Sequence, residues 1–394
     1  MKKITLLLTV ILGLTLLCPL AAYALKPADI IVLTEPELEF DIVDTFSEGL
    51  AMVKKDGQAG YIDINRNLVI PLQYESASRF SEGLAVVELY HAKGYIDTSG
   101  AEIIPTAFDN AWPFSEGLAK VEYDDWSMFY IDVSGDYISL EEYDKAGSFS
   151  EGLAYVAKDD KWGYLDKTGG VVIALEYDSA WSFFAGLAAV EKEKKWGYID
   201  TTGKVVIPLE YDLAFSFSEG LAEVKKGDKW GWIDTSGDIA IPLEHEMTGS
   251  FSEGLASIKK AGKWGYTDAT GSFVIQPEYD SAWDFKEGLA AVEKNGKWGF
   301  IDANGNIMAP IIFESVSFFS EGLAAALKDG KFVILANSTL AKIDKAKKFP
   351  KVAAYFATAD KSGPRVVFLV LAAICLVAAI VLFVIDRNRK TKKK

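Results

Sequence analysis

Glutamates recur in the motif Phe-Ser-Glu-Gly and are the most regularly placed acidic side chains of this sequence. Two carboxylates in distinct environments can serve as a general acid and a general base. Repetition, however, gives these glutamates equivalent surroundings, and Ala185 replaces one of them. The pattern therefore indicates a local role in a turn. The glutamates are Glu48, Glu82, Glu116, Glu151, Glu219, Glu253, Glu287 and Glu321.

Aspartates recur at the end of the segment Tyr-Ile-Asp, as at Asp97, Asp200 and Asp234. A dedicated calcium site needs several oxygen ligands from one loop, whereas the segment Asp-x-x-Gly supplies one carboxylate. An aspartate that opens a turn accounts for the same pattern. We therefore expect no bound metal and no cofactor.

Histidine and cysteine are scarce. The two histidines are His91 and His245, and the two cysteines, Cys18 and Cys375, lie in apolar segments near the ends of the chain. The central region thus lacks the inventory for zinc sites of the Cys₂His₂ or His₃ type, for Ser-His-Asp catalysis and for disulfides. We expect a protein that is not an enzyme and has no catalytic residues.

Tryptophans form two groups. Those that precede a glycine are predicted to be core residues between repeats, because large rings provide most of the burial available to small β units. They are Trp162, Trp196, Trp230, Trp264 and Trp298, and stacking of sugars on them is the alternative. A second group stands just before Phe-x-x-Gly in only some repeats and supplies the better candidates for exposed ligand contacts. Its members are Trp112, Trp181 and Trp283.

The motif that contains the glutamates begins at nine phenylalanines, spaced by 34 residues with a single spacing of 35. A fixed period of this size is typical of a repeat array. We assign residues 46–337 to this array. The phenylalanines are Phe46, Phe80, Phe114, Phe149, Phe183, Phe217, Phe251, Phe285 and Phe319.

Each repeat contains three predicted short strands. In the copy that begins at Phe285, an apolar run is followed by Asn295-Gly296, a strong hairpin signal, and by a second strand. The third strand is clearest before Pro208, which ends the strand or places it on a sheet edge. A three-stranded meander is too small to be stable alone, so neighbouring units should share one continuous core. The sequence predicts an all-β array of about nine such units.

The segments 161–166, 195–200 and 297–302 share the pattern Lys-Trp-Gly-aromatic-aliphatic-Asp and resemble the bacterial WG-repeat family, also called KWG repeats. The resemblance implies β-rich repeats in a binding or scaffolding role and brings no common catalytic activity. The match weakens toward both ends, which favours an open β-solenoid or superhelix, with a closed, propeller-like ring as the alternative. The departures are Ala59-Gly60, Lys93-Gly94, Met128-Phe129 and Phe332-Val333.

The central part of the chain is strongly acidic. The whole chain has a formal charge of −15, and the part from Leu25 to Pro364 has 32 basic and 55 acidic residues. Such a surface repels phosphate backbones, so we expect no nucleic acid as a partner. It suits cationic ligands, and it also serves plain solubility.

Residues 1–24 have the layout of a secretory signal peptide. Lys2 and Lys3 precede an apolar run, and Ala22-Tyr23-Ala24 supplies a cleavage site. An uncleaved anchor is the alternative, and both predict export. Residues 25–45 form a linker with one strand around 30–33, which we expect to cap the exposed end of the first repeat.

The chain after the repeats predicts a membrane anchor. Residues 338–365 form a Lys-rich juxtamembrane linker, and residues 366–385 give 20 apolar residues without a charge, enough for one transmembrane helix. The basic tail 386–394 is expected in the cytoplasm, with the repeats outside. The layout is similar to a Gram-positive cell-wall sorting signal but lacks its Leu-Pro-x-Thr-Gly motif, so we expect the protein to stay in the membrane.

The sequence favours an exported, single-pass membrane protein whose repeats form a non-catalytic binding or scaffold module at the cell surface. Its partner is expected to be a protein or a cell-wall glycan. An envelope-polymer hydrolase is one alternative, and it would require two carboxylates that break the equivalence of the repeats. A passive structural spacer is the other. Exposed rings at Trp112, Trp181 and Trp283 that line one face would argue against a spacer.

Overall fold

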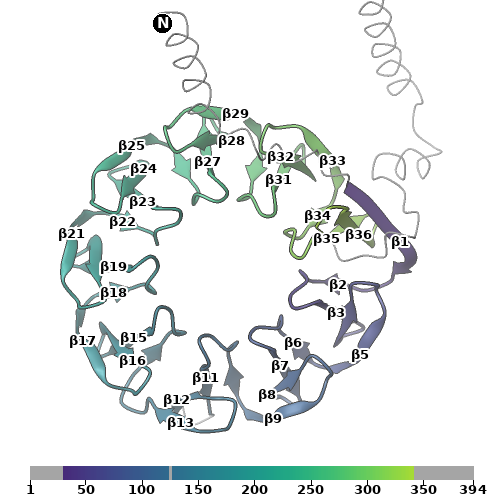
Figure 1. Ribbon diagram of the computed structural model, residues 1–394, viewed down its shortest axis with the longest axis horizontal. Coiled ribbons are helices and arrows are strands. Elements are labelled where there is room, and N and C mark those ends of the chain that lie inside the picture. Colours follow the sequence, from purple (N-terminus) through teal and green to yellow (C-terminus); the bar gives the residue numbers. More distant parts are fainter. Residues whose placement is uncertain (1–29, 124–126, 341–394) are drawn as a thin grey trace, which may run out of the picture. The chain divides into compact units, whose positions relative to one another are not determined.

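The computed structural model describes residues 30–123 and 127–340 of the chain. In this part, nine four-stranded antiparallel sheets follow one another around a central opening (Figure 1). Each sheet is a blade, and the blades are numbered 1 to 9 from β2 onward. The predicted signal peptide 1–24, membrane span 366–385 and basic tail 386–394 lie outside the described residues. Within the described part, no helix has the length and apolar character needed to cross a membrane.

The strands of each blade are ordered from the central opening outward. The innermost strands are β2 (Ile42–Val43), β6 (Ser76–Ala77), β10 (Asn110–Ala111), β14 (Lys145–Ala146), β18 (Ser179–Ala180), β22 (Leu213–Ala214), β26 (Met247–Thr248), β30 (Ser281–Ala282) and β34 (Ser315–Val316). The second strands are β3 (Leu50–Lys55), β7 (Leu84–Leu89), β11 (Ala119–Glu122), β15 (Leu153–Lys158), β19 (Leu187–Lys192), β23 (Leu221–Lys226), β27 (Leu255–Lys260), β31 (Leu289–Lys294) and β35 (Leu323–Lys328). The third strands are β4 (Gln58–Asp63), β8 (Ala92–Asp97), β12 (Met128–Ile131), β16 (Lys161–Asp166), β20 (Lys195–Asp200), β24 (Lys229–Asp234), β28 (Lys263–Asp268), β32 (Lys297–Asp302) and β36 (Lys331–Asn337). The outer strands are β5 (Leu68–Tyr74), β9 (Glu102–Phe108), β13 (Tyr137–Ser139), β17 (Val171–Tyr177), β21 (Val205–Tyr211), β25 (Ile239–His245), β29 (Phe273–Tyr279), β33 (Ile307–Phe313) and, in blade 9, β1 (Ile30–Leu38).

The innermost strand was not expected from the sequence. β18 pairs with β19 through only two residues, Ser179 and Ala180. Two residues are too few to show the alternation by which a strand is recognised. The expected three-stranded unit is therefore a four-stranded blade. Pro208 lies inside the outer edge strand β21, where register shifts interrupt the pairing with β20.

A strand from the N-terminal part of the chain closes the ring. β1 pairs antiparallel with β36, for example Leu33 with Ile334. Leu33 also belongs to the same buried cluster as Val43 and Phe46 of blade 1. The expected open solenoid is therefore wrong, and the propeller-like ring is the observed architecture. The strand around 30–33 exists, but its hydrogen bonds go to the last repeat, because a closed ring has no end face that needs a cap.

The outer strand explains the glycine of the Trp-Gly pairs. At Gly197, a Cβ would lie 2.6 Å from the carbonyl oxygen of Ile207 in β21. In the two blades whose outer strand differs, a residue with a side chain replaces this glycine. In blade 3, Phe129 pairs in regular register with Ser139 of the short strand β13, and in blade 9, where β1 is the outer strand, the residue is Val333. These departures from Trp-Gly mark a different outer strand and not the end of an open array.

The hydrophobic core lies between blades. Tyr198 and Tyr211 of blade 5 share one buried cluster with Phe217 and Val224 of blade 6. Tyr198 is fully buried, and its hydroxyl donates a hydrogen bond to the carbonyl of Phe215 at 2.8 Å. Each blade thus completes the core of its neighbour, as expected for units too small to be stable alone.

Candidate functional site

The Phe-Ser-Glu-Gly turns join the innermost strand to the second strand of each blade and lie at the inner rim of the ring (Figure 1). In blade 1, Ser47 and Leu50 exchange backbone hydrogen bonds of 2.8 and 3.1 Å. Between them, Glu48 and Gly49 have φ angles of 55° and 82°. This is a two-residue turn with both central residues left-handed. Because a left-handed backbone is unfavourable for glutamate, the recurrence of this residue points to a task of its side chain.

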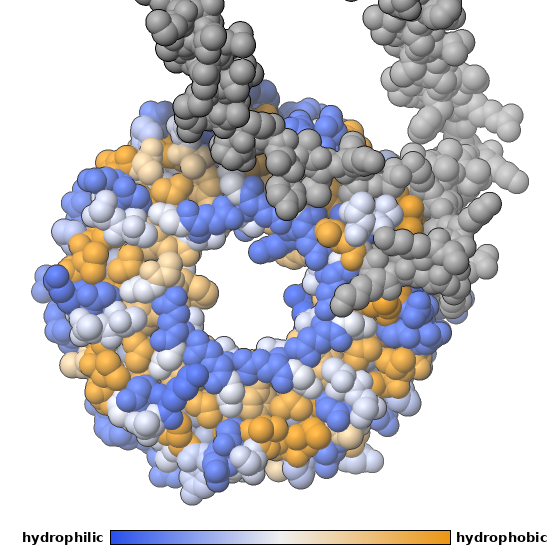
Figure 2. Space-filling view, in the orientation of Figure 1, coloured by the Kyte–Doolittle hydropathy of each residue, from blue (hydrophilic) through white to orange (hydrophobic). Residues whose placement is uncertain are grey.

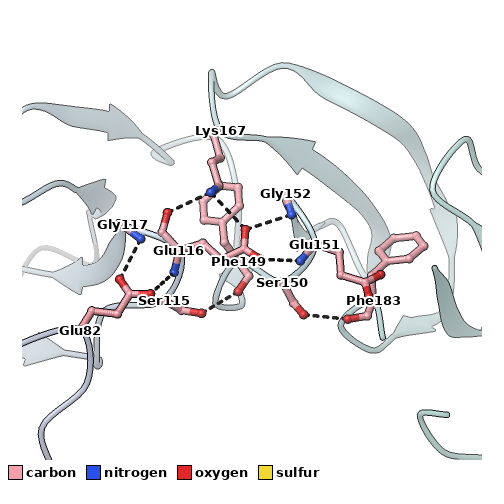
Figure 3. A network of polar contacts seen from close by, with 10 residues as sticks. All are labelled: Glu82, Ser115, Glu116, Gly117, Phe149, Ser150, Glu151, Gly152, Lys167 and Phe183. Atoms are coloured by element: carbon pink, nitrogen blue, oxygen red, sulfur yellow. Dashed lines mark hydrogen bonds and ion pairs between the residues drawn. The ribbon is translucent and has the colours of Figure 1, made fainter. Parts of the chain in front are cut away.

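Each glutamate of these turns binds the turn of the next blade. The carboxylate of Glu116 accepts hydrogen bonds from the N–H groups of Glu151 and Gly152 at 2.6 and 2.9 Å (Figure 3). Glu82 accepts the equivalent pair from Glu116 and Gly117 at 2.7 and 2.9 Å. The other contacts are Glu48 with Gly83, Glu151 with Gly186, Glu219 with Gly254, Glu253 with Gly288, Glu287 with Gly322, and Glu321 with Gly49. We call these eight side chains the glutamate belt. The expected local role is therefore wrong, because each carboxylate bridges two blades.

Serines of the same turns add a second contact between blades. Ser150 Oγ donates to the carbonyl of Phe183 in the next blade at 2.7 Å (Figure 3). Ser115 does the same to Phe149 at 2.8 Å. The serine hydroxyl thus binds a carbonyl of the next blade, and the glutamate carboxylate binds the N–H groups of its turn. Sequence reasoning could not find this contact, because its partners lie about one repeat apart.

Glu116 of the belt is suited to carry charge. Burial opposes ionisation of Glu116, but hydrogen bonds from Lys167, Gly152 and Glu151 outweigh it and lower the pKa of this carboxyl. Lys167 Nζ lies 3.1 Å from Glu116 Oε2 (Figure 3). Hydrogen bonds to the charged form are a general cause of such a shift. The turn N–H groups therefore act as carboxylate binders.

The belt is broken at blade 5, where Phe184 and Ala185 stand in place of serine and glutamate. Within the described part of the chain, no carboxylate reaches the turn of blade 6 at Glu219-Gly220. Phe184 is 48% exposed, and Trp181 on the same segment is 46% exposed. Figure 2 shows hydrophilic residues around most of the opening and apolar residues on the side of blade 5, at the left of the view. We call the five residues Trp181, Phe184, Ala185, Glu219 and Gly220 the belt break.

The three tryptophans predicted as ligand contacts lie in blades 3, 5 and 8, so the structure does not bring them into one site. Lys120 Nζ lies 3.5 Å from the ring centre of Trp112. Trp283 packs on Phe318 of blade 9 at 4.5 Å between ring centres. It also lines a cavity of about 290 Å³ together with residues of blades 9, 1 and 2. Trp181 is the most exposed of the three.

The tryptophans of the Trp-Gly pairs border the core between blades. Trp196 is 6% exposed and stacks on Trp181. The aromatic residue two positions further on is buried more deeply, as Tyr198 is in blade 5. The other four Trp-Gly tryptophans are partly exposed: Trp162, Trp230, Trp264 and Trp298.

The recurring aspartate opens the turn between the third and outer strands. Asp200 Oδ1 accepts hydrogen bonds from the N–H groups of Thr202 and Lys204 at 2.9 and 3.1 Å. The hydroxyl of Thr202 is the main cause of the lowered pKa of Asp200. These bonds give the aspartate the turn-opening role expected from the sequence.

Two carboxylates break the equivalence of the repeats, and sequence reasoning missed them. Glu223 in β23 is 6% exposed, and burial raises its pKa to about 7, although Ser250 and Thr248 donate hydrogen bonds to it. Burial also raises the pKa of Asp284 in blade 8, whose charge acts on Glu223. Gly249 stands where several other blades carry large rings, and a Cβ there would clash with Ser257 Oγ and lie 3.3 Å from Asp284 Oδ1, so the glycine lets these side chains approach. The signal in the sequence was an acidic residue within the apolar run 221–224.

One further group has the chemistry of metal ligands. Ligand atoms of Glu75, Glu88 and His91 lie within 4.8 Å of one another in blade 2. The His91 side chain is 91% exposed and its Nδ1 lies 2.9 Å from Glu75. The contact between His91 and Glu75 accounts for the proximity of these exposed side chains, and we assign no metal ion to the group.

A closed ring of four-stranded blades with similar inner turns defines a β-propeller built from repeats. A family model described as WG containing repeat matches nine consecutive stretches of the chain, and the chain therefore belongs to the WG-repeat family. The stretches are 37–58, 60–90, 94–125, 128–162, 162–196, 196–230, 230–264, 264–298 and 298–332.

One solved structure shares the fold at low sequence identity. A crystal structure described as the eukaryotic initiation factor aligns with a TM-score of 0.50 and 10% identity over 72% of this chain and 89% of that one. This likeness shows the fold alone. The extracellular domain assigned to a one-component system of B. thetaiotaomicron aligns with a TM-score of 0.31 and 10% identity, over 77% of this chain and 58% of that one. No curated protein matches the chain.

Proposed function

We propose that this protein is an exported, membrane-anchored and non-catalytic binding or scaffold module at the cell surface, and that the inner rim of its propeller receives the partner. The observation that carries the proposal is the exposure of aromatic rings at this rim. Trp181, Phe184 and Phe215 are 46, 48 and 39% exposed. At the position of Trp181 and Phe215 in the repeat, other blades carry Ser78 or Gly147, so packing of the repeat does not require a ring there.

Exposed rings at a rigid rim are favourable for binding. Aromatic side chains bury a large area on contact and lose little conformational entropy. The closed ring holds them in fixed positions, because core packing ties each blade to its neighbours, including blade 5 to blade 6. Partner contact would therefore cost little ordering of this chain.

The partner in this proposal is a protein or a cell-wall glycan, since aromatic rings stack on sugars and pack on apolar side chains alike. The acidic surface disfavours nucleic acid. Export and anchoring rest on the sequence of residues 1–24 and 366–385.

The test is intrinsic tryptophan fluorescence of the full-length chain, titrated separately with purified envelope glycans and with purified exported proteins. We expect a saturable shift that Trp181→Ala reduces strongly. Val206→Ala, an exposed position on the outer strand β21, serves as the matched control and should leave the shift unchanged. Equal titration curves for the two variants, or no shift with any partner, would refute binding at the inner rim.

A second candidate, an envelope-polymer hydrolase, is favoured by the carboxylates Glu223 and Asp284. A carboxyl with a pKa of about 7 suits a general acid at neutral pH. The 6% exposure of Glu223 argues against it, because a polymer must reach the acid. Release of soluble fragments from envelope polymers by the wild type, lost in Glu223→Gln, would establish this function in place of the first.

A further inference from the structure

We propose that the belt break is a receptor site for a carboxylate that a protein partner presents beside an apolar side chain. This inference rests on the proposed function and specifies the ligand of the inner rim. Eight of the nine inner turns hold a carboxylate from the preceding blade. Within the described residues, the turn of blade 6 is the exception.

The turn of blade 6 has the same conformation as the turns that bind a carboxylate. Glu219 and Gly220 have φ angles of 52° and 83°, compared with 56° and 81° at Glu253 and Gly254 of blade 7. In blade 7 the two N–H groups donate to a belt glutamate at 2.7 and 2.8 Å. The similar φ angles aim the N–H groups of blade 6 at the corresponding point. The fold itself therefore shows which chemical group this point takes.

Apolar surface lies on the other side of the same point. In blade 4 the hydroxyl of Ser150 reaches across to the carbonyl of the next blade, and Phe184 occupies the equivalent position in blade 5. Phe184 therefore faces the junction of blades 5 and 6, with Trp181 on the same segment. Both rings are nearly half exposed. A carboxylate with an adjacent apolar side chain would bind the N–H pair and cover these rings together.

The acidic surroundings do not forbid an anion here. An incoming carboxylate would have Glu151 and Glu219 as its neighbours along the belt, and most belt glutamates likewise have one belt carboxylate on each side. At Glu116 burial raises the pKa, but Lys167 and the N–H groups of Gly152 and Glu151 together lower it, so the N–H pair of a turn contributes to holding a charged carboxylate. The ligand would replace the one carboxylate that Ala185 removes.

The occupant is a protein segment, because the group that fills the other eight turns is itself a side-chain carboxylate of a polypeptide. Its carboxylate can come from a chain terminus or from an acidic side chain. N-acetyl-phenylalanine represents the first source and the α-amide of N-acetyl-phenylalanyl-glutamic acid, with only its side-chain carboxylate free, the second. N-acetyl-phenylalaninamide has the ring without a carboxylate and is the negative control.

The experiment follows backbone amide resonances of the full-length chain during titration with each probe. We expect the Gly220 amide to shift in a saturable way with a carboxylate probe, and the Gly254 amide, already bound by Glu219, to stay in place. The amide control should bind at least about tenfold more weakly, because charged hydrogen bonds are lost. The probe that binds more tightly identifies the source of the carboxylate.

Ala185→Glu supplies the missing belt residue and tests the geometry without a ligand. The Gly220 amide should shift toward the position of Gly254, and the probes should no longer bind. Ala261→Glu is the matched control, since Ala261 is also exposed and left-handed, with φ of 52°, but lies in a β27–β28 turn. It should keep probe binding.

Three results would overturn the inference: no Gly220 shift with either carboxylate probe, equal binding of the amide control, or an unchanged Gly220 amide in Ala185→Glu. The proposed function fails separately. If macromolecular partners bind the rim and Ala185→Glu keeps that binding, the carboxylate site is refuted and the binding module stands. If no partner binds the rim while Gly220 responds to probes, the proposed function fails alone.

Discussion

Replacing Glu223 by glutamine should make the protein more stable at neutral pH and leave its stability nearly unchanged in acid. Glu223 is a buried carboxyl whose ordinary pKa of 4.5 rises to about 7 in the folded protein, mainly through burial. The folded protein therefore binds more protons than the unfolded chain between these two values. Stability must fall as pH rises through this window and level off above about pH 7.

The size of the effect follows from the two pKa values. Each tenfold change in a proton affinity corresponds to about 1.4 kcal/mol, so a rise from 4.5 to about 7 corresponds to about 3 kcal/mol. The side chain is 6% exposed, so solvent screens little of this energy. Glutamine has nearly the same shape and no charge, and above pH 7 it should recover up to about 3 kcal/mol.

The assay is urea denaturation of wild type and Glu223→Gln at several pH values from 4.5 to 8. Asp284 is present in both proteins and its charge acts on Glu223, so the difference between their unfolding free energies measures Glu223 together with its coupling to Asp284. Glu102→Gln makes the same chemical change at an exposed residue of β9 and measures the effect of removing a surface charge. A pH-independent difference for Glu223→Gln, or a loss of stability at pH 8, would refute the argument.

Three further substitutions test the ring, each by urea denaturation. Glu116→Ala removes two inter-blade hydrogen bonds and an ion pair at a partly exposed carboxylate and should cost about 1 kcal/mol; unchanged stability would contradict a bridging role. Gly197→Ala should cost about 3 kcal/mol because its Cβ meets the backbone of β21. Gly170→Ala, whose Cβ would make ordinary contacts, should cost little. Similar losses of stability in the two variants would be inconsistent with this packing. Leu33→Ala should cost about 3 kcal/mol because Leu33 is buried where the ring closes, and partly exposed Ile31→Ala should cost less; a neutral Leu33→Ala would speak against closure by β1.

Much of the blade was predictable from its residues. The period of 34, the hairpin at Asn295-Gly296 and the turn at each Tyr-Ile-Asp are local signals, and the structure contains the elements they predict. The two-residue innermost strand was missed because it has no periodicity of its own. The family resemblance, carried by the Lys-Trp-Gly segments, is confirmed over residues 37–332.

The candidate site was only partly predictable. Trp181 was selected because it occurs in some repeats and not in others, and departure from the repeat is a signal that sequence contains. The role of the glutamates was not predictable, because the atoms that bind them lie on the next blade, 35 residues away for Glu82 and 272 residues away for Glu321. From the sequence, Ala185 indicates only a local role of the glutamates in a turn, whereas in the structure it removes a contact between two blades.

The sequence by itself determined the repeat, its β character, its turns and the residues at which one copy differs from another. These properties depend on neighbours along the chain. Only the tertiary structure decided that the array closes, because closure depends on β1 meeting β36 some 300 residues later and on a small rotation between blades accumulated nine times. The packing of each blade on the next turned eight isolated glutamates into a belt and one alanine into its break, and closure added the contact of Glu321 with Gly49.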